Sequence, residues 1–332
     1  MDEKTLKIII SKILKTVENP VFSWQGGEPT LVGLCFFKKI IELQKKYGFI
    51  GQKISNSIQT NGVLLDKKWA DFFLKYNFFV GLSLDGPKKI HNEYRIQSWD
   101  KAMKAGKILN NYGIPHNILC VLTKTSVEEP EKLLDFYLEN NHYHLQFIPA
   151  FNPPSGKSCD SIQDFSPDPY RVGNFWHVLF QKWTEQYPPE FSVRFFDSLL
   201  RIELGKKANN CRIEKNCKKY LLIESNGDIY PCDFFVEPEK KLGNIKNQKL
   251  SELAGKEKYD KFAEKKQDMS SECIECEYKK YCNGGCPRYR DLENYSGKKT
   301  YLCKAYRYFL DRNKGKIENV AQKAKKYNNL LH

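Results

Sequence analysis

Residues 53–87 read KISNSIQTNGVLLDKKWADFFLKYNFFVGLSLDGP and predict a strand, a helix and a second strand in succession. The first strand ends at an Asn-Gly turn, the segment 67–76 has the apolar spacing of a helix, and the second strand ends at Asp-Gly-Pro. Elements in this order are typical of a parallel crossover unit. The stretch therefore predicts a parallel sheet with covering helices.

The same alternation extends to both sides of residues 53–87. Over about 150 residues the sequence predicts five strands, each preceded by a helix. The predicted helices cover 3–18, 35–48, 67–76, 99–113 and 130–141, and the predicted strands cover 21–27, 53–62, 78–87, 115–124 and 142–150. This pattern predicts an α/β fold, either an open doubly wound sheet or a β/α barrel.

Polar and glycine-rich residues follow several of these strands, as in QGGEPT, QTNG and SLDGP. In parallel α/β folds the loops after the carboxyl ends of the strands form the active site, so we expect the site there. Turn formation alone explains Asn-Gly and Asp-Gly-Pro. It explains less well why the acid Glu28 follows two glycines.

The chain changes character after residue 150. Residues 152–169 read as a long loop, and helical segments follow at 170–187 and 195–204. A cysteine-rich region then spans 211–303, and the chain ends in a lysine-rich helix.

The composition excludes some classes of protein. The 332 residues carry a formal charge of +14, but the lysines are spread along the chain, as on the polar faces of helices. A nucleic-acid footprint would cluster on one element, so we expect no nucleic-acid partner, although a basic surface can attract an acidic one. No apolar run is long enough to span a bilayer, and no export signal is present. We expect a cytoplasmic protein with no membrane partner.

The cysteines indicate metal or redox chemistry. There are eleven, and Cys120 lies in a predicted strand, where a buried thiol is expected. Eight lie between residues 211 and 303: Cys211, Cys217, Cys232, Cys273, Cys276, Cys282, Cys286 and Cys303. No histidine lies between His177 and His332, so any site here is built from thiolates. The irregular spacing favours iron–sulfur clusters, while zinc held by four thiolates and disulfides remain alternatives.

The segment ESNGDIYPCDFF, residues 224–235, carries one of these cysteines on a predicted hairpin. Asp233 directly follows Cys232, so its carboxylate lies near the expected redox centre. A surface aspartate after a strand is the alternative interpretation.

Taken together, these motifs resemble a radical S-adenosylmethionine (SAM) enzyme with a SPASM domain, and within that group the anaerobic sulfatase-maturating enzymes. The resemblance rests on WQGGEPTL, SIQTNG, VGLSLDGPKKIHNEYR, LQFI and the order of the eight cysteines. It implies a partial (β/α)6 TIM-like barrel that lacks its first strand, followed by a SPASM domain that holds two iron–sulfur clusters. The implied segments are a barrel at 1–165, connecting helices at 166–210, the SPASM domain at 211–310 and a helical tail at 311–332.

The resemblance also implies a reaction. S-adenosylmethionine is cleaved reductively, and a Cys or Ser of a sulfatase polypeptide is oxidised to Cα-formylglycine. Matching motifs assign Gly26, Gly27 and Glu28 to the amino group of the cofactor, Ser83 and Arg95 to its ribose and carboxylate, and Leu145 to its adenine. They assign Gln59 to the peptide substrate and Asp233 to the base that removes the substrate proton.

The resemblance further implies two auxiliary [4Fe–4S] clusters. One would take Cys211, Cys217, Cys232 and Cys286, and the other Cys273, Cys276, Cys282 and Cys303. The expected partners are a sulfatase and an electron donor such as ferredoxin or flavodoxin.

One departure from the family is clear. The sequence contains no CxxxCxxC motif, which would hold a third [4Fe–4S] cluster, and no strand before its first helix. We therefore expect a missing amino-terminal segment and an inactive chain as given. The alternatives are another SPASM peptide maturase that forms thioethers or crosslinks, and a non-catalytic iron–sulfur remnant that binds peptides.

Overall fold

The computed structural model describes residues 1–151, 165–290 and 298–330, and most of the loop predicted at 152–169 lies outside these ranges. The chain forms two compact units, each built from discontinuous segments. The first consists of Met1–Gly81, Ile108–Pro115 and Asn216–Lys265, and the second of Leu82–Lys107, His116–Lys215 and Lys266–His332. The predicted domain boundaries at 165, 210 and 310 remain a prediction.

The main sheet has six strands in the order β1-β2-β3-β4-β5-β6. The strands are β1 (Val21–Trp24), β2 (Ser55–Thr60), β3 (Phe78–Ser83), β4 (His116–Leu122), β5 (His144–Pro149) and β6 (Ser192–Val193). The pairs β1–β2, β4–β5 and β5–β6 are parallel. The predicted α/β fold with a parallel sheet is therefore confirmed, and β6, only two residues long, is an addition that the sequence did not predict.

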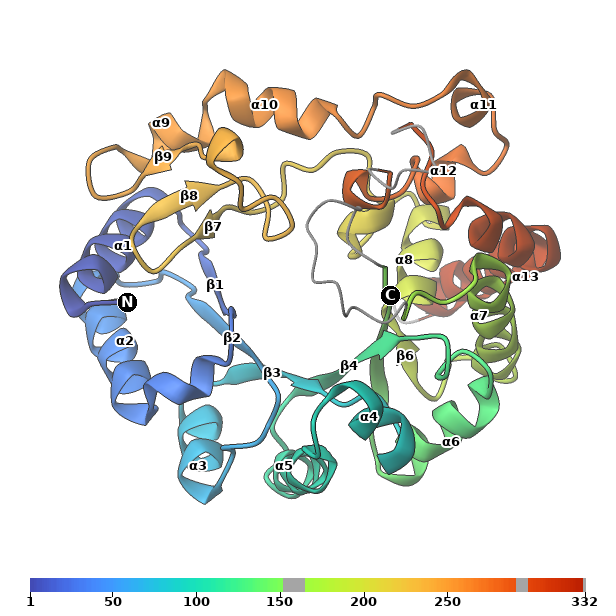
Figure 1. Ribbon diagram of the computed structural model, residues 1–332, viewed down its shortest axis with the longest axis horizontal. Helices are drawn as coiled ribbons and strands as arrows, with labels where there is room; N and C mark the ends of the chain where they lie inside the picture. The colour runs from blue at the N-terminus through green and yellow to red at the C-terminus, as the bar shows by residue number, and fades with distance from the viewer. Residues whose placement is uncertain (152–164, 291–297, 331–332) are drawn as a thin grey trace. The chain divides into compact units, whose positions relative to one another are not determined.

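In the first unit, helices α1 (Glu3–Thr16), α2 (Leu34–Tyr47) and α3 (Lys67–Lys75) accompany β1 and β2 (Figure 1). A short 3₁₀ helix, η1 (Pro29–Val32), follows β1. Local sequence explains where two helices begin, because Asp2 accepts a hydrogen bond from the backbone N–H of Thr5 and Asp66 accepts one from that of Trp69. The apolar stripe of α1 is buried, as the spacing predicted.

The first unit also contains a small antiparallel sheet of β7 (Leu222–Ile223), β8 (Asp228–Tyr230) and β9 (Gly243–Asn244). Gly227 has φ +89°, which the tight turn before β8 requires, so the predicted hairpin is confirmed. Ile229 and Leu242 pack with Ile9 of α1 in one apolar cluster. The elements η3 (Pro238–Lys240), α9 (Leu250–Ala254) and α10 (Glu257–Glu264) complete this part, and Figure 1 shows the sheet beside α1.

In the second unit, β4 and β5 are connected by α6 (Pro130–Glu139), and α4 (Lys88–Tyr94) and α5 (Trp99–Asn111) precede β4. After β5 come α7 (Pro169–Trp183), α8 (Arg194–Glu203), η2 (Cys211–Ile213), α11 (Ser271–Ile274), α12 (Lys279–Cys282), η4 (Pro287–Tyr289) and α13 (Cys303–Leu330). Aromatic rings join α13 to α7, since the ring of Trp176 packs on Tyr306 and that of Phe180 on Phe309.

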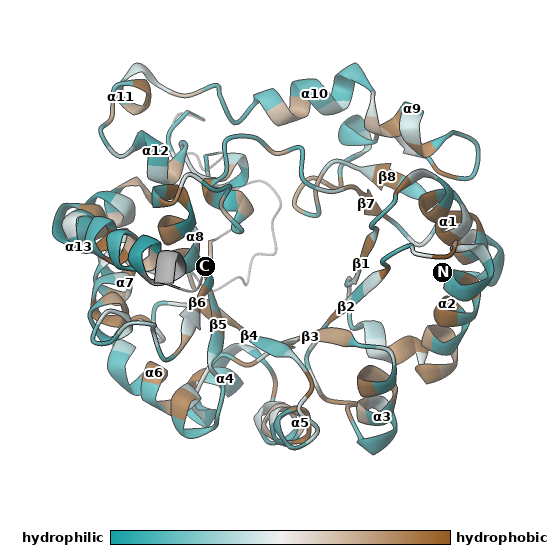
Figure 2. Cartoon of the chain, turned by 180° about the vertical axis from the view of Figure 1, so that it is seen from behind, coloured by the Kyte–Doolittle hydropathy of each residue, from teal (hydrophilic) through white to brown (hydrophobic). Residues whose placement is uncertain are grey.

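The lysine-rich tail predicted at the end of the chain is α13. Figure 2 shows hydrophilic residues along much of α13 and α10, as expected for helices with solvated faces. Among the described residues, no helix combines the length and the apolar character that crossing a membrane requires.

Candidate active site

Side chains along β2 and β3 alternate between the face of the sheet that packs on the helices and the opposite face. On β2, Ile58 is buried and the amide of Asn56 hydrogen-bonds to Gln44 of α2, so these residues face the helices. Gln59 alternates with them and faces the other side of the sheet. Ser83 likewise alternates with the buried Leu82 at the end of β3. Gln59 and Ser83 therefore lie at carboxyl ends of strands, each on the side of its strand away from the helices.

Glu28 lies in the loop that follows β1, after two glycines with φ +105° and +53° at Gly26 and Gly27. No atom lies within 4 Å of where a Cβ would stand on either glycine, so the space beside this backbone is open. The Glu28 Oε1 accepts hydrogen bonds from Thr30 N at 3.0 Å, Thr30 Oγ1 at 2.5 Å and Thr60 Oγ1 at 2.7 Å. Its Oε2 accepts one from Asn61 N at 2.7 Å, so neutral donors fix the carboxylate.

Arg95 is held by a buried acid in the second unit. Its Nε donates to Oδ2 of Asp85, and its Nη2 donates to Oδ1 at 3.3 Å. Asp85 is 6% exposed, follows Ser83 by two residues, and accepts a further hydrogen bond from the backbone N–H of Val121. The loop after β3 thus brings Ser83, Asp85 and Arg95 together.

Leu145 lies on the side of the sheet that the helices cover, unlike Gln59 and Ser83. It is 2% exposed and lies near the amino end of β5, on the same face as Phe147. The ring of Phe147 contacts Tyr137 of α6 and Phe175 of α7, so this face is covered by helices. The predicted contact of Leu145 with adenine stays a prediction.

Asp233 lies in a polar cluster in the first unit. Its Oδ1 accepts from the hydroxyl of Tyr220 at 2.5 Å and from the thiol of Cys232 at 3.2 Å. Its Oδ2 accepts from Nε2 of Gln25 at 3.4 Å. Burial raises the pKa of the Cys232 thiol to about 12, and burial also raises the pKa of Tyr220, with the neighbouring Cys232 and Asp233 adding to the shift. Both groups therefore donate toward the carboxylate.

Four thiols of the second unit influence one another electrostatically. Burial raises the pKa of Cys282 to about 11, and the neighbouring Cys276, Cys303 and Cys273 raise it further. Cys273 has the same effect on the pKa of Cys303. These are the four cysteines predicted to share one cluster, and their effects on one another show that they lie near one another. Lys299 and Arg307 lie beside them, and both form ion pairs with Glu272.

The other four predicted ligands are divided between the units. Cys217 and Cys232 pack against the apolar cluster of the first unit. In the second unit, burial lowers the pKa of Arg212, but Tyr289, Tyr306 and, to a smaller extent, Cys211 and Cys286 raise it, so both cysteines lie near this guanidinium. The ammonium of Lys266 donates to the backbone oxygen of Cys211 at 2.6 Å. Among the described residues, no three His, Cys, Asp or Glu side chains are placed to hold a single metal ion.

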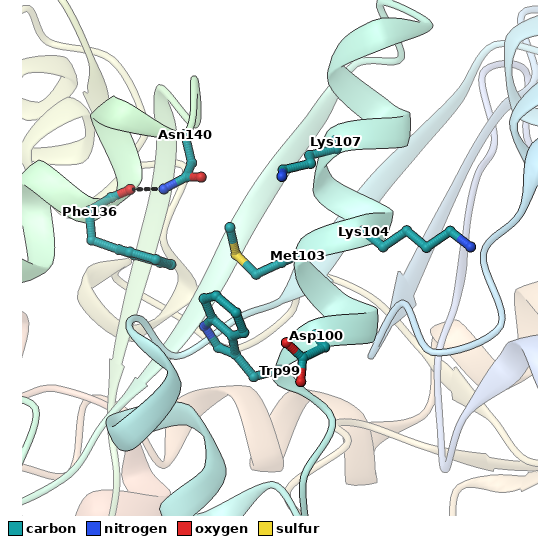
Figure 3. Close-up of a pocket in the computed structure, with 7 residues that line it drawn as sticks. All are labelled: Trp99, Asp100, Met103, Lys104, Lys107, Phe136 and Asn140. Atoms are coloured by element: carbon teal, nitrogen blue, oxygen red, sulfur yellow. Dashed lines mark hydrogen bonds between the residues drawn. The ribbon is translucent and has the colours of Figure 1, made fainter.

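A pocket of about 420 Å³ lies between α5 and α6 (Figure 3) and contains none of the predicted site residues. It is lined by Trp99, Asp100, Met103, Lys104, Lys107, Phe136 and Asn140.

The sequence did not predict several partners of the site residues. Thr60 and Asn61 hold Glu28 from the next strand, and Tyr220 holds Asp233 from a separate segment. Asp85 had a visible signal, because it lies in SLDGP beside the predicted Ser83. Tyr220 had none, since nothing in its neighbourhood distinguishes it from other tyrosines.

Comparisons with known proteins show which family this chain belongs to. The family model of the Radical SAM superfamily matches residues 3–137, and that of the SPASM iron-sulfur cluster-binding domain matches residues 211–277. The cysteine-type anaerobic sulfatase-maturating enzyme of Clostridium perfringens is 35% identical, over 98% of this chain and 90% of that protein. The serine-type enzyme of Bacteroides thetaiotaomicron is also 35% identical, over 93% of this chain and 80% of that protein.

Solved structures give the same result. Native anSMEcpe with bound AdoMet and Kp18Cys peptide has a TM-score of 0.91 at 34% identity, covering 97% of this chain and 91% of that chain. Streptococcus suis SuiB bound to S-adenosylmethionine, at 21% identity and a TM-score of 0.61, covers 91% of this chain and 70% of that chain and shares the fold. The radical SAM and SPASM matches imply S-adenosylmethionine and iron–sulfur clusters as cofactors. This chain belongs to the family of anaerobic sulfatase-maturating enzymes, which are oxidoreductases of the radical SAM superfamily.

Proposed function

We propose that this protein oxidises a Cys or Ser of a sulfatase polypeptide to Cα-formylglycine. The observation that carries the proposal is the match over nearly the whole chain to a structure that contains AdoMet and a peptide. The identity to cysteine-type and serine-type maturating enzymes supports it equally for both targets.

S-adenosylmethionine bound to a reduced iron–sulfur cluster supplies the radical chemistry. The residues of this chain bind and orient it. The open backbone at Gly26 and Gly27 and the fixed carboxylate of Glu28 suit an ammonium group. The guanidinium of Arg95 suits a carboxylate, because its N–H groups form a planar fork, and Ser83 offers a hydroxyl two residues from Asp85.

The proton of the substrate goes to Asp233 in this proposal. The carboxylate already has Tyr220 and Gln25 as donors, which hold it in a fixed orientation. A substrate thiol or hydroxyl would replace one of these donors and transfer its proton to the carboxylate. Gln59, on the side of its strand away from the helices, would contact the peptide.

We assign the eight clustered cysteines to two auxiliary [4Fe–4S] clusters, with the two sets of four given by the family motif. The mutual effect of Cys273, Cys276, Cys282 and Cys303 on their pKa values supports one set. With four thiolates per cluster, the auxiliary clusters transfer electrons and leave no iron open to the cofactor. We further propose a ferredoxin or flavodoxin as electron donor and a cytoplasmic location, where thiols stay reduced.

The first test concerns the missing motif. The 332 residues contain no CxxxCxxC, so we propose that they do not cleave S-adenosylmethionine by themselves. The chain is reconstituted anaerobically with iron and sulfide, reduced with dithionite and assayed for 5′-deoxyadenosine. We expect none from these residues and turnover from a version extended by a CxxxCxxC segment. Product from the unextended chain would contradict this part of the proposal.

The second test concerns the product. The extended version is co-expressed with a sulfatase, and the active-site peptide of the sulfatase is weighed by mass spectrometry. Formylglycine, a crosslink and an unchanged peptide have different masses, so the result separates a maturase, a crosslinking enzyme and a binding protein. We expect the Asp233→Asn variant to lose formylglycine while still consuming cofactor. The control Glu239→Gln changes an exposed acid nearby and should behave as wild type.

A further inference from the structure

We propose that Asp85 is a positioning residue that orients Arg95 toward the carboxylate of the cofactor, and that His91 and Ser98 close the loop that carries this pair. The inference rests on the proposed function, in which Arg95 binds that carboxylate. It adds a group that does not itself touch the cofactor.

Asp85 is anchored to the sheet on one side and to Arg95 on the other. The backbone N–H of Val121 in β4 donates to its Oδ1 at 2.9 Å, and Arg95 donates to both of its oxygens. The carboxylate side chain is 8% exposed, whereas the Arg95 side chain is 27% exposed. One end of the ion pair is therefore fixed in the protein interior, while the guanidinium reaches accessible space.

The loop between the two residues is closed by a chain of hydrogen bonds. The backbone N–H of Asp85 donates to Nδ1 of His91 at 3.1 Å. Because Nδ1 accepts, the proton of the neutral ring lies on Nε2, which donates to the hydroxyl of Ser98 at 3.0 Å. That hydroxyl donates to the backbone oxygen of Arg95 at 3.0 Å. His91 is 1% exposed, and its burial lowers its pKa, which favours the neutral ring that this chain of hydrogen bonds requires.

The remaining donors of Arg95 match one more carboxylate. A guanidinium has five N–H groups in a plane, and Asp85 occupies Nε and one N–H of Nη2. The edge formed by Nη1 and Nη2 carries a second pair of parallel N–H donors. Among the residues that the structure describes, Asp85 is the acid that forms an ion pair with Arg95. Fixing one edge determines the direction of the other, and it lowers the side-chain entropy that binding would otherwise cost.

The direction in which the affinity for S-adenosylmethionine changes when Asp85 is removed distinguishes a positioning role from a purely electrostatic one. If only charge mattered, removing the negative Asp85 would leave Arg95 more attractive to an anion, and binding would tighten. If Asp85 positions Arg95, its removal frees the guanidinium and binding weakens.

The test compares two ligands by isothermal titration calorimetry on the version extended by the CxxxCxxC segment, reconstituted anaerobically with iron and sulfide. S-adenosylmethionine carries the carboxylate, and 5′-methylthioadenosine keeps the adenosine and the sulfur but lacks the amino acid end. We expect Asp85→Asn to weaken binding of S-adenosylmethionine about fivefold and to leave binding of 5′-methylthioadenosine unchanged. In an Arg95→Gln background the same change should have no further effect, because the two residues act as one unit. The matched control is Asp100→Asn, which removes an exposed ion pair with Lys88 in the same segment.

Unchanged or tighter binding of S-adenosylmethionine by Asp85→Asn would overturn the inference, and so would an equal loss for both ligands. If the extended wild-type version bound neither ligand, the proposed function would be contradicted as well. Ser98→Ala provides a second variant if Asp85→Asn does not fold, because it opens the loop without removing the buried acid. It should give a smaller loss that again affects S-adenosylmethionine alone, and an unselective loss would count against the inference.

Discussion

Glu28 and Arg95, the two charged residues that we assign to the amino acid end of the cofactor, are held in different ways. Glu28 receives four hydrogen bonds from neutral donors, which fix its carboxylate without neutralising its charge, and it forms no ion pair among the residues that the structure describes. Arg95 shares its charge with the buried Asp85. The difference indicates that Glu28 contributes mainly charge and Arg95 mainly geometry. The variants of Glu28, Arg95 and Thr60 below test this division.

The largest effect is expected for Glu28→Gln. Glutamine keeps an oxygen that accepts from Thr30 and Thr60, but it loses the charge that attracts an ammonium group. We expect binding of S-adenosylmethionine to weaken about a hundredfold, which corresponds to a charge-assisted hydrogen bond of about 2.7 kcal/mol. Isothermal titration calorimetry measures the dissociation constant of S-adenosylmethionine for both proteins. A loss below about threefold would mean that Glu28 is not the charged partner.

Acid should destabilise the unit that contains Arg95, because His142 is buried there. Burial lowers the pKa of His142 to about 4, and His116 adds to the shift. The folded-state pKa is below the unfolded value of 6.5, so stability is complete above pH 6.5 and is lost as the pH falls toward 4. At pH 5 we expect a loss of about 2 kcal/mol relative to neutral pH.

Urea unfolding at both pH values, for wild type and His142→Gln, measures this contribution to stability. The variant should lose less stability on acidification, even if it is less stable at neutral pH. The control His144→Gln changes an exposed histidine and should keep the wild-type pH dependence. An equal pH dependence for wild type and His142→Gln would show that the ring does not titrate as its burial implies.

Arg95→Lys tests whether geometry dominates at the second residue. Lysine preserves the positive charge but has no planar fork, so it cannot bind Asp85 and a carboxylate along two fixed edges. We expect S-adenosylmethionine to bind about tenfold more weakly, with 5′-methylthioadenosine unaffected. If the Arg95→Lys variant kept full affinity, charge would be sufficient at both residues and the comparison with Glu28 would fail.

The smallest effect is expected for Thr60→Val, which removes one neutral donor to Glu28 with little change of shape. Thr60 is 1% exposed, and its hydroxyl lies 2.7 Å from Oε1 of Glu28. We expect stability to fall by about 1 kcal/mol and affinity for S-adenosylmethionine to change by less than about threefold, because three other donors remain. Urea unfolding and calorimetry measure the two quantities. A loss as large as that of Glu28→Gln would show that orientation, rather than charge, limits Glu28.

Sequence reasoning located the elements and most of the loops of the site. Residues 3–18 gave a helix and 224–235 a hairpin, because apolar spacing and an Asn-Gly turn are local signals. It did not place Leu145 on a face, because a short apolar strand looks the same whichever side is covered. Nor did it find β6, since two residues carry no periodicity.

The sequence by itself determined the repeating helix and strand pattern, the glycines beside Glu28 and the family motif in the cysteines. Each depends on residues that are neighbours in the chain. Only the tertiary structure decided that Asp85 joins Val121 to Arg95, that Glu28 is held from the end of β2, and which thiols raise one another's pKa. These contacts connect distant segments, and their geometry follows from strand order and register, which no local pattern encodes.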